Sequence, residues 1–267
     1  MLTDITLGQY FPVKSPIHSL DPRFKIIATF IYIIAVFMAD SILSYIVTAL
    51  FTLGMIFLSR VKLKLILKGL KPLIFIIIFT AVINIFMTTS DDVIFKAGIF
   101  KITLTGVKNA VLMALRLIFL VMGTSLLTFT TSPIMLTDGI EKLLTPFAKI
   151  GLPAHELAMM MTIALRFIPT LLEETDKIIK AQKARGADFE SGNILNRAKA
   201  LVPILVPLFI SSFRRADELA TAMECRCYRG GEGRTRLREL KINCGDWICL
   251  AVMVLFTAAV VLSSKVL

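Results

Sequence analysis

Residues 73–87 read LIFIIIFTAVINIFM, a run in which Asn84 is the one strongly polar residue. With its flanking residues, this run approaches the roughly 17–25 residues that cross the hydrocarbon core of a bilayer. We expect the Asn84 amide to bond across to a neighbouring helix. The sequence contains further runs of the same kind and therefore predicts an all-α, polytopic membrane protein with about five transmembrane helices, the other four at 26–39, 42–58, 110–127 and 247–262.

The composition of the whole chain supports this prediction. Of its 267 residues, 56% are hydrophobic and only 18% are charged, which no ordinary soluble domain of this length combines. None of the apolar runs reads as a cleavable signal. Residues 1–22 contain no apolar core segment, and no small-residue cleavage site follows the first run.

The distribution of basic residues predicts the orientation of the chain. The net charge is +11, and five of the lysines and arginines crowd the connection at 60–71, whereas the turn between the first two runs offers only Asp40. Because basic loops stay in the cytoplasm, this connection and the amino terminus are predicted to be cytoplasmic. The aromatic residues lie in the apolar runs and do not alternate with the basic ones, which argues against a nucleic-acid partner.

The four cysteines all lie in the last fifth of the chain. Cys225 and Cys227 form a C-x-C pair, and Cys244 and Cys249 follow. A zinc site is the alternative to reduced, nearly apolar thiols, but histidines are scarce and Cys249 falls inside an apolar run. We expect no metal site.

Residues 131–245 differ from the rest because charged residues alternate there with large apolar ones. Helix start and stop signals predict a short helix at 133–150 before Gly151, a long one from about 154 to 185 before Gly186, and another from about 193 to 226. The two long helices begin apolar and end amphipathic. At ~1.5 Å per residue each reaches ~48 Å, so they are expected to lie along or obliquely through the cytoplasmic boundary.

The predicted organisation thus has four parts. They are a cytoplasmic arm at 1–23, four transmembrane helices at 24–130, a cytoplasmic coupling-helix region with two or three helices at 131–245, and a last transmembrane helix at 246–267.

Charged residues at the ends and in the middle of the membrane runs have structural explanations. Asp21 is placed to cap the first membrane helix, with Pro22 at the first helical position. Arg23 and Lys25 are placed to hold that end of the helix at the cytoplasmic face. Arg116 lies inside an apolar run without an obvious acidic partner, so we expect it to face protein or the head groups.

Each long amphipathic helix ends in an arginine between small residues. One interpretation is that Arg185 and Arg226 interact with the unpaired carbonyls at a helix carboxyl end. The other is that an unshielded guanidinium at a helix tip makes bidentate bonds in a groove of a partner protein. The two triplets are Ala184-Arg185-Gly186 and Cys225-Arg226-Cys227, and their spacing alone leaves both interpretations open.

Taken together, these motifs resemble one family. The stretch GQYFPVKSPIHSLDPRFKI at 8–26 and the two arginine triplets closely resemble the transmembrane (T) component of energy-coupling factor (ECF) transporters, over essentially the whole chain. The second triplet departs from the usual Ala-Arg-Gly of the family, which puts the packing of that tip in question. The residues that carry the amino-terminal part of the resemblance are Leu20, Asp21, Pro22, Arg23 and Lys25.

The resemblance implies a scaffold in a bacterial cell membrane that joins two cytoplasmic ABC-type ATPases to one or more membrane proteins that capture a vitamin or metal ion. It implies that Arg185 and Arg226 sit in grooves on the two ATPases. The chain has no phosphate-binding loop of its own, so no catalytic residue or cofactor is expected in it and ATP is bound by its partners.

Three alternatives remain beside the shared vitamin type, which the GQYFPV opening favours. The first is a T component dedicated to cobalt, nickel or biotin. The second is a membrane-embedded enzyme, for which a titratable cluster at membrane depth would be needed, and the third is a channel, for which polar stripes along two spans would be needed. The sequence has neither of these features.

Overall fold

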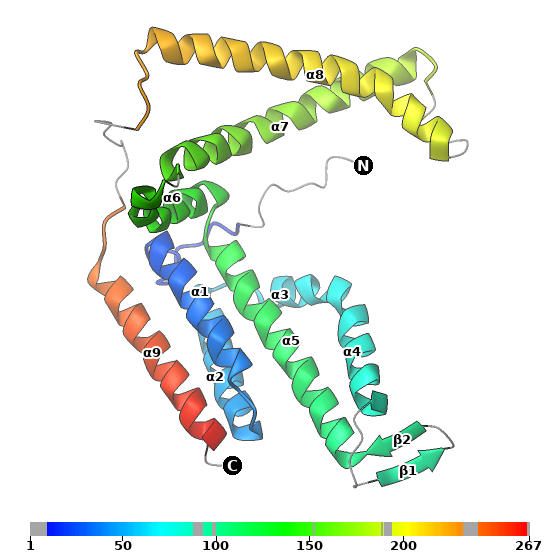
Figure 1. Cartoon of the computed structure of the whole chain (residues 1–267), viewed down its shortest axis with the longest axis vertical. Helices are drawn as coiled ribbons and strands as arrows, with labels where there is room; N and C mark the ends of the chain where they lie inside the picture. The colour runs from blue at the N-terminus through cyan, green and yellow to red at the C-terminus, as the bar shows by residue number, and fades with distance from the viewer. Residues whose placement is uncertain are drawn as a thin grey trace. The chain divides into compact units, whose positions relative to one another are not determined.

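The computed structural model describes residues 10–87, 93–97, 100–151, 153–187, 189, 194–231 and 240–265 (Figure 1). The described chain forms two compact units. The first, here called the bundle unit, comprises Gly8–Gly139 and Glu239–Leu267. The second, the long-helix unit, has its described part within Ile140–Arg238.

Four helices form the centre of the bundle unit: α1 (Pro22–Phe37), α2 (Ile42–Ser59), α5 (Leu104–Thr130) and α9 (Cys244–Lys265). Helices α1 and α2 each pack against both α5 and α9. Aromatic residues fill the space between them. The rings of Phe51 and Phe256 stack with centroids 4.0 Å apart, and Tyr32 stacks on Phe256 at 5.9 Å.

The remaining elements of the bundle unit extend from α2 to α5. Helix α3 (Leu63–Leu70) continues through a 3₁₀ turn into α4 (Ile74–Met87), which packs along α5. Strands β1 (Val93–Ala97) and β2 (Phe100–Thr103) then form an antiparallel hairpin ahead of α5. The sequence analysis did not predict this hairpin, although its β-branched and aromatic residues suit strands.

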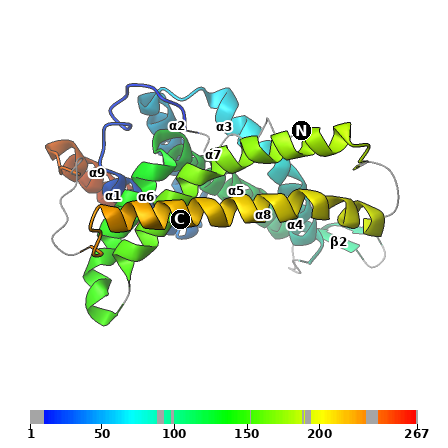
Figure 2. The same ribbon diagram turned by 90° about the horizontal axis from the view of Figure 1, so that it is seen from above.

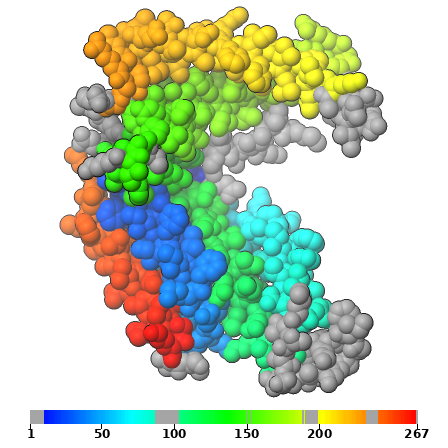
Figure 3. Space-filling model, in the orientation of Figure 1, coloured from blue at the N-terminus to red at the C-terminus, as the bar shows by residue number. Residues whose placement is uncertain are grey.

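The outer faces of the bundle helices are apolar. Helices α1 and α9 lie side by side in the space-filling view (Figure 3). Phe30 and Ile34 on α1 and Leu255 and Leu262 on α9 are each more than half exposed. Such surfaces are stable in contact with lipid chains and not in water.

The long-helix unit consists of the end of α6 (Pro133–Leu144), a 3₁₀ turn (Thr145–Ile150), α7 (Ala154–Ala184) and α8 (Ile194–Cys225). Helices α7 and α8 contact each other and run in opposite directions (Figures 1 and 2). Near their crossing Glu174 accepts hydrogen bonds of 2.7 Å from both Ser211 and Arg215. The three expected helices of this region are therefore present, and their bounds agree with the predicted ones to within a few residues.

The number of membrane-length helices agrees with the prediction, but their identity differs at one place. Among the described residues, five helical stretches are long and apolar enough to cross a membrane. Helix α7 is one of them, whereas α1, with 16 residues, is shorter than the others. The remaining stretches are Ile42–Ser59, Leu63–Phe86, Leu104–Thr130 and Cys244–Lys265.

Two expectations about polar residues inside the bundle unit have different outcomes. Among the described residues, the Asn84 amide forms no hydrogen bond to another helix and donates to the carbonyl of Thr80 one turn earlier in α4. Arg116 faces protein as expected, but it also has an acidic partner, since its guanidinium lies 3.0 Å from Asp40 and donates to the carbonyl of Ala39. Asp40 stands in the turn between two helices, and a local pattern cannot reveal that α5 passes beside it.

Candidate functional site

Arg185 ends α7 in a Schellman motif. The main-chain nitrogen of Gly186 donates to the carbonyl of Lys183, and that of Ala187 donates to Gln182, each at 3.0 Å. Gly186 has a φ of 86°, the left-handed conformation that this motif requires and that glycine adopts without strain. Arg185 is therefore the last residue before the chain turns away from the helix.

Arg226 occupies the same position at the end of α8. The nitrogen of Cys227 donates to the carbonyl of Glu224 at 2.8 Å, and that of Tyr228 donates to Met223 at 3.0 Å. Cys227 has a φ of 54° and thus takes the left-handed conformation that Gly186 takes in α7. Although cysteine replaces glycine, the backbone geometry of the second tip matches that of the first.

Both arginine tips are open to their surroundings. The residues at the two tips are all exposed, namely Ala184, Arg185, Gly186, Cys225, Arg226 and Cys227. Because α7 and α8 are antiparallel, their carboxyl ends lie at opposite ends of the helix pair (Figure 2). Arg185 and Arg226 follow these two ends. Within the long-helix unit the two cations are thus presented separately and do not form one basic cluster.

The chain beyond the second tip packs against the start of α7. A Cβ atom added at Gly231 would lie 2.6 Å from the His155 ring, so only glycine fits there. The Nδ1 atom of His155 lies 3.1 Å from the carboxylate of Glu141 at the end of α6. No comparable contact appears at Gly186, where an added Cβ would meet nothing within 4 Å.

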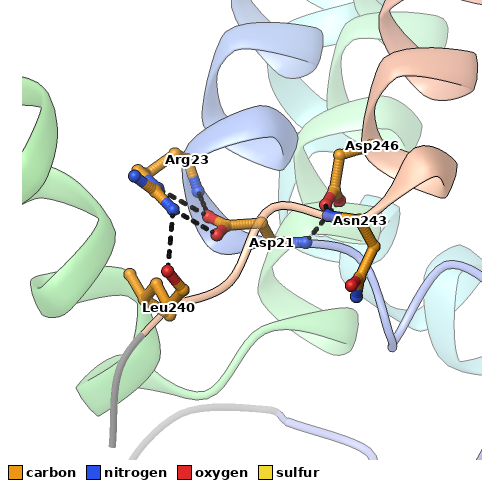
Figure 4. Close-up of polar contacts among 5 residues, drawn as sticks. All are labelled: Asp21, Arg23, Leu240, Asn243 and Asp246. Carbon is orange, nitrogen blue, oxygen red and sulfur yellow. Dashed lines mark hydrogen bonds and ion pairs between the residues drawn. The ribbon is translucent and has the colours of Figure 1, made fainter.

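The amino-terminal motif forms a cluster of polar contacts at the start of α1 (Figure 4). Asp21 is the N-cap residue of α1, and its carboxylate accepts hydrogen bonds from the main-chain nitrogen and the guanidinium of Arg23. Arg23 also donates to the carbonyl of Leu240 at 3.3 Å. The main-chain nitrogen of Asp21 donates to Asp246 at 2.7 Å. We call this cluster the α1 clamp, made by Asp21, Arg23, Leu240, Asn243 and Asp246.

Asp246 is the member of the clamp that the sequence analysis missed. Its second carboxylate oxygen accepts from the main-chain nitrogen of Asn243 at 2.8 Å, and the residue is only 1% exposed. An acidic residue three positions after Asn243, at the start of an apolar run, is the signature of a capping box. That signal was available, but it could not indicate that the other oxygen binds Asp21.

The carboxyl group of Asp21 is held in its charged form. Burial disfavours the carboxylate, but the hydrogen bonds and the positive charge of Arg23 outweigh this effect, so the pKa of Asp21 lies below its ordinary value. The cap predicted for Asp21 and Pro22 is confirmed.

The remaining residues of the amino-terminal motif are packed inside the bundle unit. Lys25 is buried, at 6% exposed, and donates to the carbonyls of His18 and Thr130 at 3.1 Å. Leu20 is half-buried, and its side chain would lie 3.8 Å from a Cβ atom added at Gly245.

The four cysteines are free thiols, and the described residues contain no group of three or more metal-ligating side chains. The long-helix unit thus carries an exposed arginine at the end of each long helix. Exposed guanidinium groups of this kind can form charge-assisted hydrogen bonds with another protein.

The chain is similar to known proteins over nearly its whole length. The family model described as cobalt transport protein (CbiQ) matches residues 13–237. The energy-coupling factor transporter transmembrane protein EcfT of Clostridium kluyveri is 61% identical over 95% of this chain and 96% of its own length. The corresponding proteins of Ruminiclostridium cellulolyticum and Bacillus subtilis are 54% and 51% identical, over 100% and 90% of this chain and 99% and 91% of their own lengths.

The fold and these similarities define a multi-pass membrane subunit of an ATP-driven transporter, and the subunit itself is not catalytic. Within that class, the chain belongs to the EcfT/CbiQ family, the transmembrane energy-coupling components of ECF transporters.

Proposed function

We propose that Arg185 and Arg226 are the two points at which this subunit docks onto two cytoplasmic ABC-type ATPases. The observation that carries the proposal is the matching cap geometry of the two tips, in which each arginine directly follows the last helical residue and precedes a left-handed residue. Capping alone does not require exposed small neighbours, whereas insertion of a guanidinium into a partner's groove does.

The partners on the membrane side are one or more substrate-binding subunits that capture a vitamin or another micronutrient. Support comes from the apolar segment of α8 at 200–213, where Leu205, Val206, Phe209 and Phe213 are each about half exposed or more. ATP-driven closure of the two ATPases moves the arginine tips relative to each other. The rigid helices carry this motion to their apolar halves and so to the substrate-binding subunit.

The proposal includes location and cargo. The chain lies in a bacterial cell membrane, with the amino terminus, the basic connection at 60–71 and both arginine tips in the cytoplasm, as the positive charges favour. ATP is bound by the ATPases and no cofactor by this subunit. A shared scaffold for several vitamins is preferred. A subunit dedicated to cobalt, nickel or biotin is the alternative, and the description of the matching family model keeps it open.

The test is affinity purification of the tagged subunit from its native membrane, followed by mass identification of the accompanying proteins. We expect two ABC-type ATPases together with hydrophobic membrane proteins of more than one kind. One constant membrane partner would instead indicate the dedicated type.

Charge reversal at each tip makes the test specific. Arg185→Glu and Arg226→Glu are expected to lose the ATPases, because a carboxylate replaces the cation that the groove binds. Lys180→Glu and Arg229→Glu are matched controls, since both residues are exposed and lie within a few residues of the tips. Full retention of both ATPases and full uptake in both arginine variants would overturn the proposal.

A further inference from the structure

The chain leaves the bundle unit next to the amino-terminal motif. Helix α6 passes into the long-helix unit after Gly139. At that point a Cβ atom added to Gly139 would lie 3.0 Å from Pro22 and 3.2 Å from Ile26. The backbone of α6 therefore packs directly on the first turn of α1, and glycine is what permits the close approach.

The chain also returns to the bundle unit next to this motif. The first described residue after the long-helix unit is Leu240, whose carbonyl accepts a hydrogen bond from Arg23. Three residues later the main chain at Asn243 is bound by Asp246, which binds Asp21 at the same time. Both contacts are made with the first residues of α1 or its cap.

We propose that the first turn of α1 is the anchor for both chain connections of the bundle unit, packing against the departing chain at Gly139 and binding the returning chain at Leu240. Arg23, Asp21 and Asp246 act as positioning residues, because they touch neither an ATPase nor a substrate. A motion that reaches either connection then acts against a fixed point in the bundle unit and is not lost in a loose chain segment. This inference deepens the proposed coupling function and depends on that function for its biological meaning.

The physical basis of the anchor is the burial of its polar groups. Asp21 and Asp246 are 5% and 1% exposed. The carboxylate of Asp21 accepts hydrogen bonds from Arg23, and that of Asp246 accepts from the main-chain nitrogens of Asp21 and Asn243. Removing one partner leaves the other groups buried without hydrogen bonds, which opens the contact. Loss of the Arg23 guanidinium therefore releases Leu240 and leaves the α1 helix itself capped by the main-chain bond to Asp21.

The test measures how firmly the returning chain is held inside the bundle unit, in the full chain in lipid nanodiscs. Spin labels are placed at position 54 on α2 and at position 241 next to Leu240, in a variant whose four native cysteines are replaced by serine. An added side chain at Gly54 meets nothing within 4 Å, and Lys241 is exposed. We expect Arg23→Gln and Asp246→Ala to broaden the distribution of distances between the two labels.

Arg116→Gln is the matched control for Arg23→Gln. Arg116 is also ion-paired, is about as exposed as Arg23, and also donates to a main-chain carbonyl in the bundle unit, but at the turn between α1 and α2. Broadening in the Arg23 and Asp246 variants with an unchanged distribution in Arg116→Gln supports the anchor. No broadening, or equal broadening in all three variants, overturns it.

This measurement is independent of the ATPases. In the same labelled chain, Arg185→Glu and Arg226→Glu are expected to leave the distribution unchanged. A failed purification experiment with an intact anchor would therefore contradict the proposed docking only. The reverse pattern would contradict the anchor only.

Discussion

The ring of Tyr32 on α1 lies against the backbone of α5 at Gly123, where an added Cβ atom would come within 2.2 Å of the ring. The hydroxyl group of Tyr32 is held by Thr52 at 2.8 Å and donates to the carbonyl of Phe119 at 3.0 Å. The ring therefore cannot move aside without breaking these buried hydrogen bonds.

Gly123→Ala is accordingly expected to destabilise the protein by about 1–3 kcal/mol, the usual range for an overpacked core. Thermal unfolding in detergent, followed by circular dichroism, measures the effect. Gly54→Ala is the control, because an added Cβ there meets nothing within 4 Å and alanine favours a helix. A melting temperature of Gly123→Ala equal to that of the parent would contradict the tight contact.

The two arginine tips give opposite predictions for substitution of their left-handed residues. A residue with a side chain in that conformation costs about 1 kcal/mol relative to glycine. Cys227→Gly should therefore stabilise the end of α8, and Gly186→Ala should weaken the end of α7 by a similar amount. Hydrogen exchange of peptides covering the tips should become slower in the first variant and faster in the second. Changes in the same direction would show that strain at these positions is not the cause.

Gly231→Ala is expected to displace the segment after the second tip, because its methyl group would enter the space of the His155 ring. Adding His155→Ala removes the ring and should restore much of the loss. Limited proteolysis or thermal unfolding of the single and double variants measures this coupling, which appears as non-additivity. If the stability lost in the double variant equalled the sum of the losses in the two single variants, the two residues would not interact.

We expect the packing of the amino-terminal arm to lose stability in mild acid, because it depends on His18. Its Nδ1 lies 2.7 Å from Ser15, and its Nε2 lies 3.0 Å from the carbonyl of Phe11. Burial lowers the pKa of His18, and the positive charge of Lys25 lowers it further, against the hydrogen bond to Phe11, which raises it.

Because the folded state disfavours the charged imidazole, the contribution of His18 to stability is complete above its ordinary pKa of 6.5. It is lost as the pH falls through the lower folded pKa. The melting temperature of the parent should therefore fall more between pH 7 and pH 5 than that of His18→Gln. Parallel pH curves for the two proteins would refute the role of His18.

The helices of this chain could be predicted from local signals because each signal acts within one or two turns. Asp21 and Pro22 start α1 as expected, Gly151 ends the turn after α6, and Gly186 ends α7. The β1–β2 hairpin was missed because its two strands are too short to stand out between two strongly apolar helices.

Only part of the candidate site could be predicted, again because sequence signals are local. The two arginine triplets could be found because each lies in one contiguous stretch at a helix end. The partner of Arg116 and the burial of Lys25 were missed, because both depend on which helices are neighbours. The matching backbone geometry at Cys227 was also missed, since cysteine seldom adopts a left-handed conformation.

The sequence by itself determined that the chain is a helical membrane protein, because apolar run lengths and cap residues are local properties. The contiguous motifs at 8–26 and at the two arginine triplets carried its resemblance to the family to which it belongs. Only the tertiary structure decided that Asp246 binds the main chain of Asp21, 225 residues away, and that Gly139 packs on Pro22. Contacts of this kind arise when separate helices pack together and bury their polar groups in pairs, and no local pattern specifies which groups will meet.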